Sequence, residues 1–351
     1  MNRPTPPIEW AEDHIRIIDQ TLLPAEVKIV EVRNAAQAVD AIQRLAIRGA
    51  PALGAFGSLA LIVALDETRP RSLSEAQSRL EECRTLIGDA RPTAVNLRWA
   101  VDRVIDQATS NADDLPTLRA ALIREAHAVA AEDEAACNEI GRLGHELLRD
   151  ANVIGTHCNA GRLATAGTGT ALAPMYAKAE AGEPLRVLAS ETRPLLQGAR
   201  LTAWELDDAG IDVTVVPDSA MASTVLSGQV DAYIVGADRI AANGDAANKI
   251  GTVGHALASR EAGIPFYVAA PTSTIDIALA TGNHIEIEQR DAIEVHEIYG
   301  SRLTPEGVAA SNPAFDVTPN HLITAIITEA GVLRAPFKDS IAEALSRVRS
   351  S

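Results

Sequence analysis

The chain has 351 residues, more than one ordinary domain needs, so two domains are expected. Hydrophobic residues make up 47% and charged residues 22%, which is globular composition and excludes a disordered chain. The formal net charge of -16 argues against a nucleic-acid partner, because such proteins carry a basic surface that neutralises phosphates. Local basic groups can still bind a small anion.

The cysteines and the apolar segments predict a cytoplasmic protein with no membrane partner. Cys83, Cys137 and Cys158 show no C-x-x-C spacing, so neither a disulfide framework nor a zinc cage is encoded, and a reducing compartment is expected. Residues 1–10 lack the apolar core of a signal peptide. The apolar run Ala52–Leu65 is shorter than the ~20 residues that span a bilayer and predicts a buried helix.

Residues 1–149 predict a mainly helical domain with a small sheet. Extended runs at Ile15–Ile18 and Val27–Val32 predict strands, and Asn34 with Gln37 is a capping box that opens a helix running toward Arg48. Further helices follow, each with its own signal. They are a helix begun by Pro51, an amphipathic helix after Arg91-Pro92-Thr93 with Val95, Leu97, Trp99, Val101 and Ile105 as its apolar positions, and a long helix over 116–148.

Residues 150–351 predict a second, α/β domain. Short apolar runs alternate with helices that end at glycines, which indicates βαβ units and a parallel sheet covered on both faces. The runs are Asn152–Thr156, Leu185–Ser190, Val213–Val216, Ala232–Val235 and Phe266–Ala270, and the glycines are Gly182, Gly210 and Gly263. The fold class is therefore α/β, with a Rossmann-like doubly wound parallel-sheet domain after the helical one.

Ligands of such sheets bind beyond the carboxyl ends of the strands, which selects the loops 156–161, 191–198 and 236–249. From spacing alone, Cys158 is either a small buried hydrophobe or a thiolate held by backbone amides. Asp238 is either a turn residue that pairs with Arg239 or a general acid at the end of a strand.

Arg48, Arg91 and Lys249 stand at predicted helix starts, where free amides and the helix dipole favour an anion. Singly, each of these residue types is more often a solvated surface charge than a ligand. Together they favour a phosphorylated substrate. Gly167-Thr168-Gly169 lacks the last glycine of a dinucleotide fingerprint, and the histidines lack metal-ligand spacing, so neither a cofactor nor a metal is expected.

Six ordered segments give the chain a resemblance to a known family. They are Arg48–Ala52, Arg91–Leu97, Thr156–Gly161, Glu191–Arg200, Gly236–Lys249 and Asn312–Pro319. Over nearly its whole length the chain resembles the methylthioribose-1-phosphate isomerases of methionine salvage, which are similar to the alpha, beta and delta subunits of initiation factor 2B. The resemblance implies a helical N-terminal domain, a Rossmann-like C-terminal domain and a homodimer.

The resemblance also assigns site residues. Cys158 and Asp238 match the catalytic pair of the family. The substrate-binding positions that match are Arg48, Gly49, Ala50, Arg91, Gln197, Asn248 and Lys249. Because these lie in both halves of the chain, the site is expected to need both domains. Arg162 departs from the family, which has a small residue there, and is either a surface charge or a residue that contacts the far end of the sugar.

The implied reaction is an aldose–ketose isomerisation without a cofactor. Asp238 suits the general acid that protonates the ring oxygen, because phosphate on C1 prevents spontaneous ring opening. Cys158 acts either as a base through a cis-enediol or as the stabiliser of a hydride shift. Two alternatives are a non-catalytic regulatory protein, against which the presence of both catalytic positions argues, and a ribose-1,5-bisphosphate isomerase, which Asn159-Ala160-Gly161 and the long N-terminal half make a poorer match.

Overall fold

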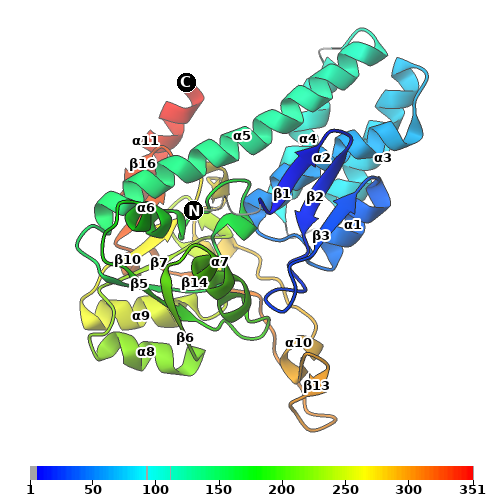
Figure 1. The fold of residues 1–351 in the computed structure, drawn as a ribbon. Coiled ribbons are helices and arrows are strands. Elements are labelled where there is room, and N and C mark those ends of the chain that lie inside the picture. Colours follow the sequence, from blue (N-terminus) through cyan, green and yellow to red (C-terminus); the bar gives the residue numbers. More distant parts are fainter. Residues whose placement is uncertain (1–5, 92–93, 111, 351) are drawn as a thin grey trace. The chain divides into compact units, whose positions relative to one another are not determined.

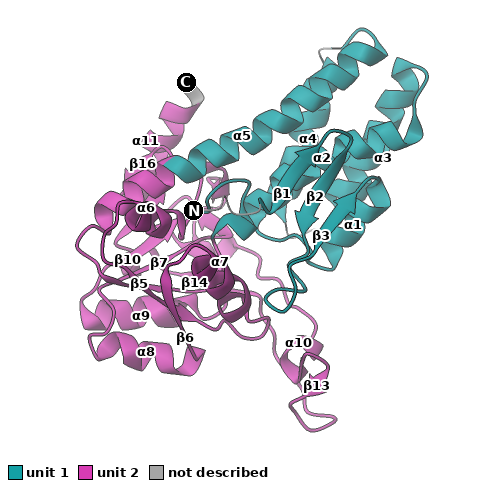
Figure 2. Ribbon diagram, viewed as in Figure 1, with its two compact units in different colours: residues 1–138, 161–169 teal, residues 139–160, 170–351 magenta. Residues whose placement is uncertain are grey.

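The computed structural model describes residues 6–91, 94–110 and 112–350. By internal contacts the chain divides into two compact units, shown in different colours in Figure 2. Unit 1 comprises residues 1–138 with 161–169, and unit 2 comprises 139–160 with 170–351. This division differs from a single cut after residue 149, because helix α5 (Leu115–Leu147) crosses position 138 without a break and because a short later segment belongs to unit 1.

Unit 1 has the predicted small sheet and helices (Figure 1). The sheet is antiparallel in the order β1-β2-β3, with a first strand that the sequence did not predict. Helix α3 was likewise not predicted, and the other elements of the unit follow the expected order. The elements of the unit are β1 (Ile8–Ala11), β2 (His14–Ile18), β3 (Ile29–Val32), α1 (Ala35–Gln43), α2 (Ala50–Thr68), α3 (Leu73–Gly88), α4 (Val95–Ser110) and the first part of α5.

The capping box that opens α1 is present. The side chain of Asn34 accepts a hydrogen bond from the Gln37 amide at 2.9 Å, and the Gln37 side chain accepts one from the Arg33 amide at 2.7 Å. The helix ends at Gln43, short of the predicted Arg48, since Leu45 takes a left-handed conformation with φ of 63°.

Helix α2 is the core of unit 1. It is the one helix in the described part of the chain that is long and apolar enough to cross a membrane, but 78% of that stretch is buried inside the protein. Every residue from Ala52 to Leu65 is buried, and α3 and α4 pack against it. The helix is therefore apolar all round because it is surrounded by protein.

The buried face of α4 corrects one sequence-based expectation. Leu97, Val101 and Ile105 are buried, as predicted, whereas Val95 is 48% and Trp99 is 45% exposed. Two positions along a helix correspond to roughly 200° of rotation, so Leu97 lies on the opposite side from both of the exposed residues.

Unit 2 is built on a seven-stranded sheet in the order β16-β15-β10-β7-β4-β5-β6. Its strands are parallel except β16, which is antiparallel to β15. The five predicted strands are confirmed, and β15 and β16 were not predicted. The strands are β4 (Val153–Thr156), β5 (Arg186–Ser190), β6 (Asp212–Val216), β7 (Ala232–Val235), β10 (Phe266–Ala269), β15 (Ala325–Thr328) and β16 (Gly331–Leu333).

Helices cover both faces of this sheet, so the Rossmann-like doubly wound expectation is confirmed. Alternate residues of β7 face different cores: Tyr233 and Val235 belong to one apolar cluster and Ala232 and Ile234 to the other. The first cluster includes residues of α8, α9 and α11, and the second includes residues of α6, α7 and the end of α5. These helices are α6 (Ala173–Glu180), α7 (Ala203–Asp208), α8 (Asp218–Leu226), α9 (Thr252–Ala262) and α11 (Phe337–Ser350).

A second, four-stranded sheet in the order β11-β8-β9-β14 belongs to the same unit. It begins directly after β7 and is not predicted by the sequence pattern. Its strands are β8 (Arg239–Ala241), β9 (Ala246–Lys249), β11 (Ile275–Asp276) and β14 (Phe315–Thr318). The remaining elements between β11 and β14 are short. They are α10 (Ile293–His296), β12 (Glu297–Ile298) and β13 (Ser301–Arg302).

Candidate active site at the carboxyl edge of the unit 2 sheet

The strand order of the large sheet reverses direction between β4 and β7. From β4 the chain proceeds to β5 and β6 on one side, and then to β7, β10 and β15 on the other. Cys158 lies two residues after β4, and Asp238 lies three residues after β7. The two predicted catalytic residues thus follow the adjacent strands at the switch point, where open α/β sheets bind their ligands.

Cys158 lies in a tightly held turn. Its backbone is left-handed, with φ of 62°, and the residue is 8% exposed. The amide donates to the Thr192 hydroxyl at 2.9 Å, and the carbonyl accepts from the Thr202 hydroxyl at 2.6 Å. A left-handed conformation costs a non-glycine residue roughly 1–2 kcal/mol. Hydrogen bonds on both sides of the residue hold that backbone conformation.

A buried carboxylate supports the next residue of the turn. The Asn159 amide group donates to Glu205 and to the Thr202 hydroxyl, the latter at 3.2 Å. The Tyr176 hydroxyl donates to the other Glu205 oxygen at 3.1 Å. Glu205 is 0% exposed. Sequence reasoning missed this residue, and the only signal was an acidic side chain beside the buried Leu206 on a short helix.

His157 connects the Cys158 turn to the loop after β9. Its Nε2 lies 2.9 Å from the Ile250 carbonyl, so this nitrogen carries the proton. Its Nδ1 lies 2.5 Å from the Ser190 hydroxyl and 3.2 Å from His255 Nε2. Burial lowers the pKa of His157 to about 4, and burial followed by the charge of His157 also lowers the pKa of His255. Both rings are neutral near pH 7 and have a structural role.

Asp238 stands at the start of the second sheet. Its amide donates to the Ala247 carbonyl at 2.9 Å, and the register of β8 with β9 sets it across from Asn248. The Asn248 side chain donates to the Thr252 hydroxyl at 3.1 Å. Burial lowers the pKa of Arg239, while the charges of Asp276 and Asp238 act in the opposite direction. Three predicted site residues, Asp238, Asn248 and Lys249, are therefore held by the same small sheet.

Gln197 follows β5 and begins the short π-helical turn Gly198–Thr202. The residue is 6% exposed. Among the described residues no group donates a hydrogen bond to its buried Oε1. A buried acceptor without a donor is costly, so this atom suits a ligand that carries a hydroxyl.

The start of α9 corrects the argument that linked Lys249 to open helix amides. The Asp316 carboxylate accepts from the Gly251 amide at 2.8 Å and from the Val253 amide at 3.3 Å. A protein carboxylate therefore takes the position that the helix offers to an anion. Any contact between Lys249 and a phosphate must come from its side chain.

The remaining predicted residues belong to unit 1. Gly49 caps the N-terminus of α2 with φ of 94°, and a Cβ at this position would lie 2.5 Å from the Ala164 carbonyl oxygen. Only glycine fits between Arg48 and Ala50. Arg91 accepts from the Ala94 amide at 2.9 Å, and Pro92 and Thr93 lie outside the described residues.

Arg162 lies in a short 3₁₀ turn, Arg162–Ala164, and is only 7% exposed. Its interpretation as a solvated surface charge is therefore wrong. The following carbonyl, of Leu163, accepts from the Gln20 side chain at 2.7 Å, which ties the turn to the N-terminal part of unit 1.

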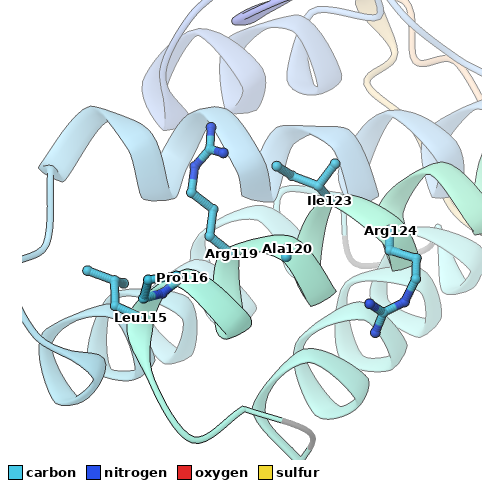
Figure 3. Close-up of a pocket in the computed structure, with 6 residues that line it drawn as sticks. All are labelled: Leu115, Pro116, Arg119, Ala120, Ile123 and Arg124. Carbon is cyan, nitrogen blue, oxygen red and sulfur yellow. The ribbon is translucent and has the colours of Figure 1, made fainter.

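Helix α5 of unit 1 carries an open hollow of about 670 Å³. Figure 3 shows its lining residues, all from the first turns of the helix: Leu115, Pro116, Arg119, Ala120, Ile123 and Arg124. Arg119 forms a two-pronged ion pair with Asp66, at 2.8 and 2.6 Å. None of the predicted site residues lines this hollow. Over the described residues, no group of three or more His, Cys, Asp or Glu side chains is placed to hold a metal ion.

These features define an α/β protein with a candidate ligand site at the switch point of a Rossmann-like sheet. The profile of the Initiation factor 2 subunit family matches residues 46–335, and the chain belongs to that family. It is 51% identical to the 5-deoxyribose 1-phosphate isomerase of Moorella thermoacetica and 48% identical to the methylthioribose-1-phosphate isomerase of Desulforudis audaxviator, with 99% of each chain covered in both comparisons. The crystal structure of 5-methylthioribose 1-phosphate isomerase from Pyrococcus horikoshii is 39% identical, with a TM-score of 0.92, and covers 98% of this chain and 97% of its own.

Proposed function

We propose that the chain is a sugar-phosphate isomerase that converts 5-methylthioribose 1-phosphate into 5-methylthioribulose 1-phosphate in methionine salvage. The observation that carries the proposal is the placement of Cys158 and Asp238 after adjacent strands at the switch point, in a chain 48% identical to a relative named for this reaction. A fold alone does not define an activity, so the site has to support the chemistry.

Asp238 serves as the general acid. It donates a proton to the ring oxygen while the bond from that oxygen to C1 breaks, and the ring oxygen becomes a hydroxyl. The hydrogen on C2 moves to C1, and the C2 hydroxyl returns a proton to Asp238, which leaves a ketone at C2. Substrate and product have the same atoms and electrons, and no external oxidant or cofactor takes part.

Cys158 acts on the hydrogen that moves between C2 and C1. In one route its thiolate removes this hydrogen as a proton and returns it to C1 through an enediol. In the other route it stabilises the cation at C1 while a hydride shifts. Its held backbone supports both routes, because it limits where the Cβ atom that carries the thiol can lie.

The other matched residues bind the substrate. The unsatisfied Oε1 of Gln197 accepts from a sugar hydroxyl, and Asn248 contacts the sugar from the second sheet. The cations of Arg48, Arg91 and Lys249 hold the phosphate. Gly49 and Ala50 complete the binding set of Arg48, Gly49, Ala50, Arg91, Gln197, Asn248 and Lys249.

We further propose a homodimer that works in the cytoplasm. All three cysteines are free thiols, and burial raises the pKa of Cys83 to about 11 and that of Cys137 to about 12. Thiols that stay protonated are poor nucleophiles for disulfide exchange, which suits a protein that keeps them reduced.

The proposal is tested by NMR of the purified protein with a panel of pentose 1-phosphates. A ketone signal at C2, with retention of the phosphate, is expected for 5-methylthioribose 1-phosphate. The same reaction in D₂O distinguishes the two routes, since the enediol places deuterium on C1 and the hydride shift does not. Absence of turnover on every member of the panel would contradict the proposal.

Single substitutions test the two catalytic roles. Cys158→Ala and Asp238→Asn should each lower kcat by about 10²–10⁴-fold, the usual contribution of a general acid or base. Both variants should unfold at the same urea concentration as wild type. Near-wild-type turnover by either variant would remove that residue from the mechanism.

A second candidate substrate is 5-deoxyribose 1-phosphate. The 51% identity to the Moorella thermoacetica enzyme of that name favours it. The two sugars differ only at C5, so the same acid and thiol would act on both. The ratio of kcat/KM for the two sugars, measured in competition, identifies the preferred one.

A further inference from the structure

The segment Asn312–Pro319, one of the six that gave the family resemblance, has no role in the proposed chemistry. It contains β14, which pairs antiparallel with β9. The register sets Phe315 directly opposite Lys249 and Asp316 opposite Asn248. Directly opposed residues of an antiparallel pair have side chains in contact, so β14 is the neighbour that decides where the Lys249 side chain lies.

The Lys249 ammonium has two contacts with this segment. Its Nζ donates to the Ala314 carbonyl at 3.0 Å and lies 4.5 Å from the centre of the Phe315 ring. The second distance is that of a cation–π contact. Neither the carbonyl nor the ring carries a net charge. Both orient the ammonium and stabilise its positive charge.

The backbone beside Lys249 is fixed by other groups. The Ile250 amide donates to the Ala314 carbonyl at 3.0 Å, and the Gly251 amide donates to the Asp316 carboxylate at 2.8 Å. From the other side, the Ile250 carbonyl accepts from His157. Since these bonds hold the loop without the Phe315 side chain, the ring acts on the lysine head group and not on the course of the chain.

A further acidic group, Glu294, is bound both to this segment and to an arginine. Glu294 accepts from the Arg290 guanidinium at 2.9 Å and from the Asn312 amide group at 3.0 Å. Arg290 also pairs with Glu288 at 3.1 Å. Asn312 therefore helps to direct the Glu294 carboxylate toward Arg290, and the charge of Lys249 acts on that carboxylate more weakly than Arg290 and Asn312 do.

We propose that Phe315 is a positioning residue of the phosphate site, whose ring holds the Lys249 ammonium charged and oriented toward the substrate phosphate. This inference rests on the proposed function for the assignment of Lys249 to the phosphate. It adds a residue that does not touch the substrate and that the family resemblance did not assign.

The test compares Phe315→Leu and Phe315→Met, which remove the aromatic face, with Phe315→Tyr, which keeps it. A cation–π contact of the usual strength predicts that KM for the sugar phosphate rises by about 2–30-fold in the first two variants. The dissociation constant for inorganic phosphate, measured by calorimetry, should rise by the same factor, with kcat within about twofold of wild type. Phe315→Tyr should restore both values.

A double-mutant cycle shows whether the ring acts through the lysine. In a Lys249→Met background, Phe315→Leu should change phosphate binding by less than about twofold, because the interaction is already absent. A full effect of Phe315→Leu in that background would overturn the inference. A loss of kcat at unchanged KM would also overturn it, because that result indicates a merely structural role. A Phe315→Met variant that folds and binds phosphate like wild type would overturn it as well.

The phosphate titration separates this inference from the proposed function. If wild type binds inorganic phosphate with the predicted coupling but isomerises no pentose phosphate, the proposed function fails and the role of Phe315 stands. If wild type isomerises the sugar phosphate but Lys249→Met binds inorganic phosphate as tightly as wild type does, the role of Phe315 fails and the proposed function stands.

Discussion

At the scale of single residues, the candidate site depends on groups that never reach the substrate. The left-handed turn at Cys158 is held by the hydroxyls of Thr192 and Thr202, and Asn159 is held by Glu205. Burying a carboxylate is costly unless it is hydrogen-bonded, and Glu205 has donors on both oxygens. The backbone that carries the Cys158 thiol is thus held by its neighbours in the fold.

Glu205→Ala is expected to destabilise the protein by about 2–5 kcal/mol, because it leaves the Asn159 amide group and the Tyr176 hydroxyl buried without their acceptor. Urea unfolding measures this change. The matched control is Glu343→Ala, which removes an exposed ion pair with Arg347 and should change stability by less than about 1 kcal/mol. Equal effects of the two substitutions would show that the buried network does not stabilise the turn.

At the scale of elements, the junction of β9, β14 and α9 holds the predicted site residues Asn248 and Lys249 and the proposed positioning residue. Asp316 caps α9, and Phe315 lies opposite Lys249. Burial raises the pKa of the Asp316 carboxyl to about 6, although the amides of Gly251 and Val253 act in the opposite direction.

The raised pKa of Asp316 has a definite consequence for stability. Between pH 3.8 and about 6 the folded protein binds a proton on Asp316 that the unfolded chain does not, so the contribution of this group to stability falls as the pH rises through that window. The unfolding free energy of wild type minus that of Asp316→Asn should fall by about 2.4 kcal/mol between pH 4 and pH 7.

Urea unfolding of both proteins across this pH range is the measurement. Subtracting the unfolding free energy of Asp316→Asn from that of wild type removes the contributions of all other titrating groups, including the buried histidines. A difference that instead grows with pH would mean that the helix amides outweigh burial and keep Asp316 ionised.

At the scale of the whole molecule, helix α5 belongs to both units. Residues up to 138 pack in unit 1, whereas Ile140 and Leu148, both fully buried, belong to the core of unit 2. A boundary drawn after residue 149 would remove this part of the helix from the sheet that it covers.

Two fragments test this division. The fragment 139–351 should keep a cooperative unfolding transition, whereas 150–351 lacks Ile140 of α5 and Leu148, which directly follows this helix. The shorter fragment should be less stable by about 3–6 kcal/mol, from two fully buried residues at about 1.5–3 kcal/mol each. Circular dichroism during urea unfolding provides the comparison. Both fragments retain the segment 161–169, so it cannot account for a difference. Equal stability of the two would place the boundary after residue 149.

The sequence alone determined the features that depend on neighbouring residues. The capping box of Asn34 and Gln37, the apolar strands β4, β5 and β7, and the glycines after α6, α7 and α9 are local signals, because backbone preferences and side-chain periodicity act over a few residues. The order of those strands then predicted that Cys158 and Asp238 would lie at one edge of the sheet.

Only the tertiary structure decided which distant segments meet. The pairing of β14 with β9, the burial of Glu205 beneath the Cys158 turn and the contact of Phe315 with Lys249 join residues far apart in the chain. No local pattern encodes such pairs, since each depends on how whole elements pack. Asp316 likewise fills the helix start that the sequence had suggested for a phosphate, because a strand from elsewhere in the chain brings its carboxylate there.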